Sequence, residues 1–311
     1  MTRPVRVLSL YEGFFAGGAR ILHSDVVAGL TRNGSQQHRV LSLTSAARRD
    51  ASLQLARDDG RFRRLRTAGV RIDTFDRVAG DHPLAPEDFT DAELAHAASL
   101  FAEADVVLSL KEQPLSLVVA LRRAGLLPDR PIAACLHRSD PTHSGPALGW
   151  LADSAASGAV TATIACAEST SIAYSRAGVA AATSWVIDNG IDTRRFRPGT
   201  RAERARIRAG LGIPESAPVI VLAARFDAMK DPGLFLRAVA QHARRTPEAH
   251  YVVCGAGMTS DNPAFLALRA ESGVGPDVPV HALGLRDDVP ELFRAADIVA
   301  LTSAYGEASP L

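Results

Sequence analysis

Short, continuous apolar runs alternate with helical patterns along almost the whole chain, and this alternation restricts the fold more than any other feature. Strands that are apolar throughout, rather than at every second residue, are buried on both faces. Helices between such strands are the usual connection in a parallel sheet. The predicted strands are Val5–Leu10, Arg39–Leu43, Val70–Phe75, Asp105–Leu110, Pro131–Leu136, Val160–Cys166, Ser184–Ile187, Val219–Ala223, His250–Cys254, Val280–Leu283 and Ile298–Leu301.

The order of these segments indicates two doubly wound α/β domains with parallel sheets. A chain of 311 residues has about the length of two domains. An Arg-rich, Pro-containing stretch at Asp192–Arg208 separates the first series of strands from the second. We therefore predict an N-terminal Rossmann-like domain over 1–190 and a C-terminal one over 191–311. Ligands of such sheets bind beyond the carboxyl ends of the strands.

Two connecting helices have clear boundaries in the sequence. One is predicted over Ala19–Arg32, with Gly34 as its stop signal. Its apolar residues fall on one face, which we expect to be buried: Ile21, Leu22, Val26 and Leu30. The other is predicted over Pro232–Arg245.

The composition argues against several classes of protein. A net charge of +1 gives no overall attraction for nucleic acid. No apolar run approaches the roughly 18 residues of a membrane span. Cys135, Cys166 and Cys254 each lie alone in an apolar segment, which favours buried thiols over a zinc site. The default expectation is a cytoplasmic protein. The alternative is a cytoplasmic protein bound peripherally at the inner face of the membrane.

Lysine is nearly absent, so Lys230 stands out. Of the 35 Lys and Arg residues, only Lys111 and Lys230 are lysines. Lys230 follows Arg225 by five positions, after the predicted strand Val219–Ala223. An ammonium and a guanidinium at the carboxyl end of one strand indicate a phosphate clamp. The alternative is a solvent-exposed lysine at the start of a helix.

A pair of glycines, Gly17 and Gly18, follows the first strand and precedes a helix. Glycine lets the backbone approach a ligand, and a helix start presents free N–H groups to an anion. The spacing matches neither the Gly-x-Gly-x-x-Gly fingerprint nor a Gly-Lys phosphate loop. The pair by itself is a weak signal of an anion site.

Five segments, in order, resemble motifs of the retaining glycosyltransferase family 4, whose members have two Rossmann-like domains facing a cleft (GT-B type). They are Gly17-Gly18-Ala19 with Arg20 in place of the usual Glu, Val186 to Asp192 with Arg195-Phe196-Arg197-Pro198, Arg225 with Lys230, Val253 to Gly257, and Ala295 to Val299 with Ser303 to Pro310. Together they span most of the chain.

The resemblance implies transfer of a hexosyl group from a nucleotide-diphosphate sugar to an acceptor hydroxyl, with retention of the anomeric configuration. Arg225 and Lys230 would hold the donor diphosphate. Gly17 and Gly18 would let the N-terminal domain close on the donor. Glu307 would contact the donor sugar hydroxyls as the first Glu of a Glu-x7-Glu motif, and we assign it to the catalytic site.

The resemblance also implies a truncation. The second Glu of the motif would fall eight positions after Glu307, and the chain ends at Leu311. We therefore expect an incomplete second domain, an open flank along Ile298–Leu301, and weak activity and marginal stability of this chain alone. Whether the chain is a fragment or ends naturally at Leu311 stays open.

The N-terminal domain supplies the remaining candidates. In the family a His near the place of His137 faces the donor sugar, so we assign His137 a catalytic role; the alternative is a strand-end His that caps carbonyl groups. Lys111 and Arg138 are assigned to the acceptor side, with Asp140 at the periphery. The alternative for Lys111 and Glu112 is a surface ion pair.

No Asp-x-Asp motif occurs in the sequence. Because glycosyltransferases that hold the diphosphate through a metal usually carry one, we expect no metal and no cofactor beyond the donor substrate. Arg225 and Lys230 would stabilise the leaving group instead. The rival functions are a sugar-nucleotide epimerase on the same fold and a non-catalytic binding subunit.

The expected partners are a nucleotide-sugar donor and a sugar, lipid-linked or small-molecule acceptor, with no nucleic acid. The basic segment Arg57–Arg66 is typical of a solvated helix face. Its alternative is peripheral contact with an anionic membrane surface.

Overall fold

The computed structural model describes residues 3–15, 17–34, 36–49, 52–80 and 82–309. The chain forms two compact units: Met1–Gly190 together with Glu307–Leu311, and Ile191–Gly306. The sequence analysis assigned Glu307 to the C-terminal domain, whereas its contacts group it with the first unit.

The first unit is built on a seven-stranded parallel sheet of order β10-β9-β8-β7-β1-β2-β5. The order reverses between β1 and β7, which makes their carboxyl ends the topological switch point where doubly wound sheets bind ligands. The strands are β1 (Val5–Tyr11), β2 (Gln36–Ser42), β5 (Arg71–Thr74), β7 (Val106–Leu110), β8 (Ile132–Leu136), β9 (Ala162–Ala165) and β10 (Thr183–Val186).

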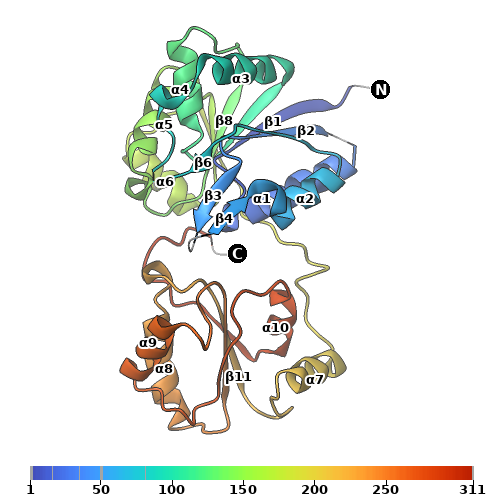
Figure 1. Ribbon diagram of the computed structural model, residues 1–311, viewed down its shortest axis with the longest axis vertical. Helices are drawn as coiled ribbons and strands as arrows, with labels where there is room; N and C mark the ends of the chain where they lie inside the picture. The colour runs from blue at the N-terminus through green and yellow to red at the C-terminus, as the bar shows by residue number, and fades with distance from the viewer. Residues whose placement is uncertain (1–2, 16, 35, 50–51, 81, 310–311) are drawn as a thin grey trace. The chain divides into compact units, whose positions relative to one another are not determined.

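Helices cover both faces of this sheet (Figure 1). One face packs on α1 (Gly18–Arg32) and α2 (Gly60–Thr67). The other packs on α3 (Asp91–Glu103), α4 (Leu115–Arg123), α5 (Pro146–Ala156) and α6 (Glu168–Arg176). Short 3-10 helices η1 (Ala56–Asp58), η2 (Pro86–Asp88) and η3 (Pro141–Ser144) join these elements.

The face of α1 that is buried differs from the predicted one. Ser24, Val27 and Ala28 are buried, while Ile21 and Val26 are exposed. Small residues let α1 lie close to the sheet, where the Tyr11 hydroxyl shares a hydrogen bond of 2.8 Å with His23 Nδ1. Val27 and Ala28 therefore lie on the core side of this helix, and Ile21 and Val26 do not.

A small sheet of order β4-β3-β6 was not predicted from the sequence. It consists of β3 (Ala46–Arg49), β4 (Ser52–Leu55) and β6 (Val78–Ala79). These segments are short and lack the continuous apolar runs that marked the other strands.

The second unit has a four-stranded parallel sheet of order β13-β12-β11-β14. Its strands are β11 (Val219–Ala223), β12 (His250–Cys254), β13 (Val280–Ala282) and β14 (Ile298–Ala300). α8 (Pro232–Ala243) and α9 (Pro263–Glu271) cover one face, and α7 (Arg201–Gly210) and α10 (Val289–Ala295) cover the other (Figure 1).

The edge strand β14 pairs with β11 and carries exposed apolar side chains. Ile298 is 57% exposed, Val299 51% and Leu301 52%. Apolar side chains are therefore exposed along this edge of the sheet.

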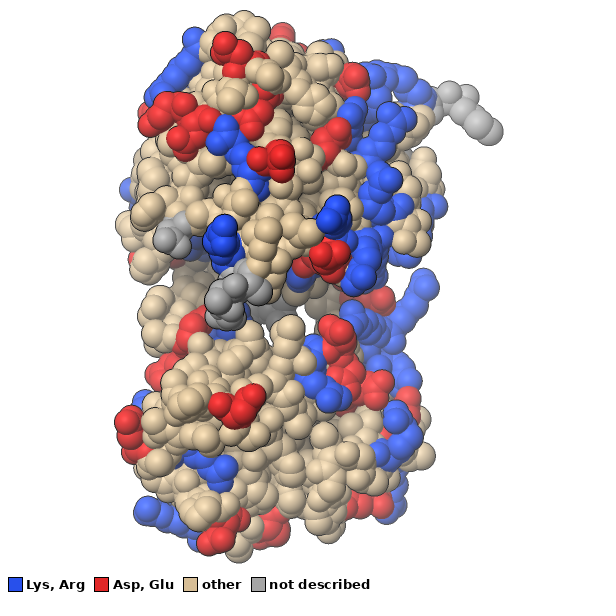
Figure 2. All heavy atoms as spheres, viewed as in Figure 1, with Lys and Arg blue, Asp and Glu red and all other residues tan. Residues whose placement is uncertain are grey.

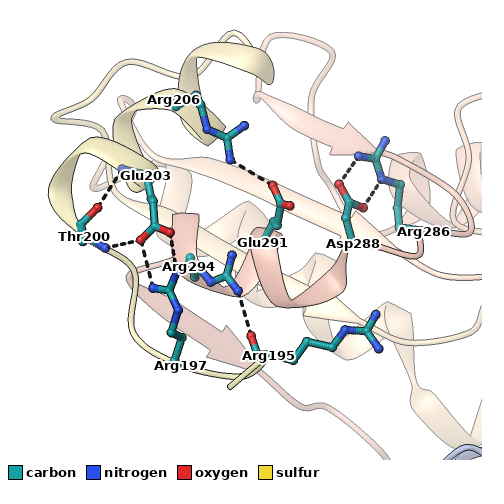
Figure 3. A network of polar contacts seen from close by, with 9 residues as sticks. All are labelled: Arg195, Arg197, Thr200, Glu203, Arg206, Arg286, Asp288, Glu291 and Arg294. Atoms are coloured by element: carbon teal, nitrogen blue, oxygen red, sulfur yellow. Dashed lines mark hydrogen bonds and ion pairs between the residues drawn. The ribbon is translucent and has the colours of Figure 1, made fainter. Parts of the chain in front are cut away.

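The segment after Gly190 is fixed to the second unit by polar contacts (Figure 3). Arg294 donates to the Arg195 carbonyl at 2.8 Å, and Arg197 pairs with Glu203 at 2.6 Å. Glu203 also accepts from the backbone N–H of Thr200 at 2.7 Å, which completes a capping box at the start of α7. The arginines of this segment therefore attach it to α7 and α10.

Two global expectations agree with the structure. Cys135, Cys166 and Cys254 are buried free thiols. Among the described residues, no helix is both long and apolar enough to cross a membrane.

Candidate functional site

In the first unit, the site residues gather at the carboxyl ends of β1, β7 and β8. Lys111 directly follows β7, and its backbone N–H donates to the Cys135 carbonyl at 3.1 Å. Lys111 has φ 72°, a left-handed backbone conformation that residues other than glycine seldom adopt. Such strain recurs at functional sites, because only the surrounding structure can maintain it.

The Lys111 ammonium is half-buried in a basic environment. Burial lowers its pKa, and the positive charges of Arg20 and Arg138 lower the pKa further. Glu112 and Glu12 oppose this effect. Among the described residues, no hydrogen bond or ion pair engages the ammonium.

Glu112 is fully buried, so its alternative assignment to a surface ion pair with Lys111 is wrong. Its carboxylate accepts a hydrogen bond from the Tyr174 hydroxyl, and Arg138 Nε lies 3.9 Å from Glu112 Oε2. Burial and this carboxylate raise the pKa of Tyr174. A buried carboxylate needs such partners. The ion pair with Glu112 in turn holds Arg138 next to the end of β8.

Arg20 replaces the Glu expected from the family motif, and its side chain lies next to Gly17. Its guanidinium is 3.7 Å from Glu12, and its side chain is only 12% exposed. A Cβ added to Gly17 would lie 3.3 Å from Arg20 Nη2. Gly17 therefore leaves room for Arg20, while Gly18 begins α1 and is exposed.

His137 follows β8 and is half-buried beside this cluster. Burial lowers its pKa to about 4, with Lys111 contributing in the same direction. The imidazole is therefore neutral at physiological pH and can accept or donate a hydrogen bond without carrying charge. Asp140 accepts from the backbone N–H of Thr142 at 2.9 Å and serves as a cap of η3, outside the cluster.

In the second unit, Arg225 and Lys230 follow β11 as predicted. Arg225 pairs with Asp227 at 2.9 Å and its side chain is 47% exposed. Asp227 also accepts from the backbone N–H of Lys230 at 3.1 Å, which closes the 3-10 turn η4 (Ala228–Lys230). Asp231, with φ 40°, accepts from Leu234 N–H at 2.9 Å and caps α8. Both aspartates therefore act as N-caps, Asp227 of η4 and Asp231 of α8.

The loop after β14 is tied to the loop that carries Lys230. Thr302 Oγ1 donates to the Lys230 carbonyl at 3.1 Å, and Ala304 N–H donates to the Met229 carbonyl at 2.9 Å. Because β11 and β14 are neighbours in the sheet, these contacts lie at its carboxyl edge. The backbone around Lys230 is thus held by contacts to the segment after β11 and to the segment after β14.

Gly255 allows the closest approach at this edge. Its φ is 137°, and an added Cβ would lie 2.0 Å from the Ala224 carbonyl oxygen. The Gly255 N–H donates to the Gly284 carbonyl at 2.7 Å. The glycine turn after β12 therefore supports the loop that begins at Ala224.

Glu307 is half-buried and belongs to the first unit by its contacts. No group of three or more His, Cys, Asp and Glu side chains in the described ranges is arranged to hold a metal ion. The sequence analysis did not assign roles to Tyr174, Glu12 or Arg20; only the departure of Arg20 from the family motif could have pointed to one of them.

Parts of the chain are similar in sequence to known glycosyltransferases. Residues 203–311 match the family described as Glycosyl transferases group 1. The D-inositol 3-phosphate glycosyltransferase of Salinispora arenicola is 38% identical over 132 residues, which cover 39% of this chain and 29% of the relative. The enzyme of the same name from Mycolicibacterium gilvum is 36% identical over 123 residues, covering 38% and 26%. The matches thus span less than a third of these relatives.

Solved structures match nearly the whole chain. HepE of Anabaena in complex with UDP has a TM-score of 0.74 at 21% identity, covering 97% of this chain and 75% of that one. A glycosyltransferase of Rickettsia africae has a TM-score of 0.66 at 14% identity, covering 97% and 74%. The likeness shows the predicted fold, two Rossmann-like units of the GT-B type.

Proposed function

We propose that the chain is a glycosyltransferase that moves a hexosyl group from a nucleotide-diphosphate sugar to an acceptor hydroxyl, with retention of configuration. The observation that carries this proposal is the pair Arg225 and Lys230 after β11, in the region that matches the Glycosyl transferases group 1 family. The UDP, glucose and UDP-glucose complexes of HepE support a uridine diphosphate sugar as the donor to test first.

Arg225 and Lys230 neutralise the diphosphate as the glycosidic bond to the leaving group breaks. Charge that develops in the transition state is stabilised best by cations that are already in position. Asp227 and the Thr302 and Ala304 contacts keep the Lys230 backbone in place before the donor arrives. Glu307 contacts the donor sugar, and Gly17 and Gly18 let backbone approach it.

The acceptor binds to the first unit at the carboxyl edge of its sheet. His137 is the candidate that acts near the reacting sugar, and its neutral imidazole suits a hydrogen bond to a hydroxyl group. Lys111 and Arg138 orient the acceptor. Epimerisation is not supported, since no additional paired carboxylates adjoin this cluster in the part of the chain that the structure describes.

Transfer proceeds without a divalent metal, because two side-chain cations supply the charge that a metal would supply elsewhere. The proposal is tested by incubating the chain with uridine diphosphate sugars and measuring release of the nucleotide. We expect weak turnover that persists in EDTA. Absence of turnover with every nucleotide sugar would contradict the proposed function, and recovery only on adding Mn²⁺ or Mg²⁺ would contradict its metal-free form.

Peripheral contact with an anionic membrane surface belongs to the same proposal. Lys and Arg side chains gather on the visible face of the first unit along the side of α1 and α2 (Figure 2). Arg63, Arg64 and Arg66 on α2 are exposed, and the neighbouring α1 exposes Ile21 and Val26. Basic and apolar side chains together favour an interfacial helix. Co-sedimentation with anionic vesicles, lost in high salt, is the expected result in a cytoplasmic protein of this kind.

A further inference from the structure

The second unit contains a cavity that lies apart from the residues assigned to the donor. It has a volume of about 460 Å³ and is lined by the segment 196–199 and by residues of α7 and α10. Arg225 and Lys230, which the proposed function uses, follow β11 and are not among its lining residues. Cavities of about 300–1,000 Å³ commonly bind small molecules, so the chemistry of the wall indicates which class of molecule fits.

One part of the wall is apolar and aromatic. The ring centroids of Phe196 and Phe293 lie 6.5 Å apart, with an angle of 48° between the ring planes. Pro198 and Pro290 extend this surface without adding a backbone N–H group. Aromatic rings of this kind favour contact with the face or edge of another ring. This part of the cavity therefore suits a planar aromatic group.

The rest of the wall is basic, and two of its three arginines already have carboxylate partners. Arg197 pairs with Glu203 at 2.6 Å. Arg204 pairs with Asp297 and also donates to the Ala296 carbonyl at 3.1 Å. These two guanidinium groups are therefore held in place by the protein itself.

Arg294 is the arginine of this wall that has no carboxylate partner among the described residues. Its Nη2 donates to the Arg195 carbonyl at 2.8 Å (Figure 3). Its Nε is buried and makes no hydrogen bond to any residue that the structure describes. A buried donor without an acceptor is destabilising, and an oxyanion against this guanidinium would supply the acceptor. A carboxylate matches the planar fork of one guanidinium.

The Arg294 side chain is also fixed along its length. A Cβ added to Gly199 would lie 3.1 Å from Arg294 Cβ and 3.3 Å from its Cγ and Cδ, so the aliphatic part of Arg294 packs closely on the segment before α7. The Arg195 carbonyl holds the other end of the side chain. A guanidinium held in this way loses little freedom when it binds an anion, which favours binding.

We propose that this cavity binds a small molecule that consists of a planar aromatic ring and one carboxylate. Phe196 and Phe293 contact the ring, and Arg294 binds the carboxylate. Arg197 and Arg204 complete the basic part of the wall. The site goes beyond the proposed function and does not depend on it, since none of these residues is assigned to the donor or to the acceptor.

Calorimetry with 2-naphthoate tests this site in the full chain. Uridine diphosphate is present at saturation, so that the proposed donor site is occupied. The comparison compounds are 2-naphthalenemethanol, which keeps the ring, and acetate, which keeps the charge. We expect both to bind at least about tenfold more weakly than 2-naphthoate, because each lacks one of the two sets of contacts. Equal affinity for 2-naphthoate and 2-naphthalenemethanol would overturn the proposal, as would a parent chain that binds no 2-naphthoate.

Variants assign the ligand to this cavity. Arg294→Gln should weaken 2-naphthoate binding about tenfold or more, because it removes the charged donor. Arg294→Lys should also weaken it, since an ammonium lacks the planar fork. Phe293→Leu, which keeps an apolar side chain but removes the ring, should weaken it about threefold.

Arg206→Gln is the matched control. Arg206 is an arginine of α7 whose side chain is 68% exposed, and it does not line the cavity. The control should bind 2-naphthoate as the parent chain does. If Arg294→Gln does not fold, Arg294→Lys and Phe293→Leu still decide the question. Unchanged affinity in these two variants, or an equal loss in Arg206→Gln, would overturn the proposal.

Discussion

The two units share an architecture but hold their cations in different ways. In the first unit the cations are half-buried and lie next to carboxylates. Arg138, for example, lies next to the buried carboxylate of Glu112. In the second unit Arg225 is exposed, and the order of its loop comes from backbone contacts to Asp227 and to the segment after β14. Charge burial thus positions the first cluster, and backbone geometry positions the second.

This contrast predicts where each unit is most sensitive to mutation. The first unit should suffer most from the loss of a buried charged partner. The loops of the second unit that follow β11 and β12 should suffer most where added atoms disturb their close packing. Both effects are larger than those expected from the exposed cations themselves.

The largest effect is expected for Glu112→Ala. The change removes the carboxylate on which Tyr174 and Arg138 depend and leaves a buried positive charge without its counter-ion. We expect a loss of about 3–5 kcal/mol in the free energy of unfolding. Chemical denaturation followed by circular dichroism measures it. Glu87→Ala, at a 73% exposed side chain, is the control and should change stability by less than about 0.5 kcal/mol. Equal losses in the two variants would contradict the structural role of the buried Glu112 carboxylate in the first unit.

The second effect is expected for Gly255→Ala in the second unit. The new Cβ would meet the Ala224 carbonyl oxygen at 2.0 Å, and φ 137° is unfavourable for alanine. Overpacking and backbone strain together should cost about 2–4 kcal/mol. The control is Gly210→Ala at the end of α7, where an added Cβ meets no atom within 4 Å. A melting temperature of Gly255→Ala that equals that of Gly210→Ala would show that the turn is not closely packed.

The pH dependence of stability should be dominated by the first unit. Burial lowers the pKa of His23 to about 3 and that of His137 to about 4, below the ordinary value near 6.5. The unfolded chain therefore binds more protons than the folded chain between these values. The stabilisation is complete above about pH 6.5 and is lost progressively as the pH falls toward 4.

His137→Asn tests the contribution of one histidine to this slope. Each such group contributes about 1.4 kcal/mol per pH unit between its two pKa values, so the variant should show a shallower loss of stability on acidification. Denaturation series at pH 7, 6 and 5 measure it. His82→Asn serves as the control, because His82 is exposed and lies far from the cluster in the sequence. Parallel curves for the parent chain and His137→Asn would contradict the buried, neutral His137.

Most of the fold followed from the sequence, because the continuous apolar runs of parallel strands are a strong local signal. β11 and β12 lie at the predicted residues, as do the carboxyl ends of β7 and β8. Arg225 and Lys230 were found for the same reason, since each has a fixed place after its strand. The sheet of β3, β4 and β6 was missed because its strands are short and lack a long continuous apolar run.

The details of the first unit could not be read from local patterns. The burial of Glu112 depends on Tyr174, which lies on α6 and far along the chain. The buried side of α1 depends on the contacts of Tyr11 and on the small residues Ser24 and Ala28, whereas periodicity pointed to Ile21 and Val26. Arg20 and Glu12 form a pair only through the turn that leads into α1.

The most direct test of the central claim, that the donor diphosphate binds to Lys230 in the second unit, is the affinity for uridine diphosphate in Lys230→Ala and Lys111→Gln. Calorimetry should show about tenfold or greater weakening in Lys230→Ala, because a charged partner of the diphosphate is lost. Lys111→Gln should bind uridine diphosphate as the parent chain does. Unchanged affinity in Lys230→Ala, or equal weakening in both variants, would contradict the assignment of the diphosphate to the second unit.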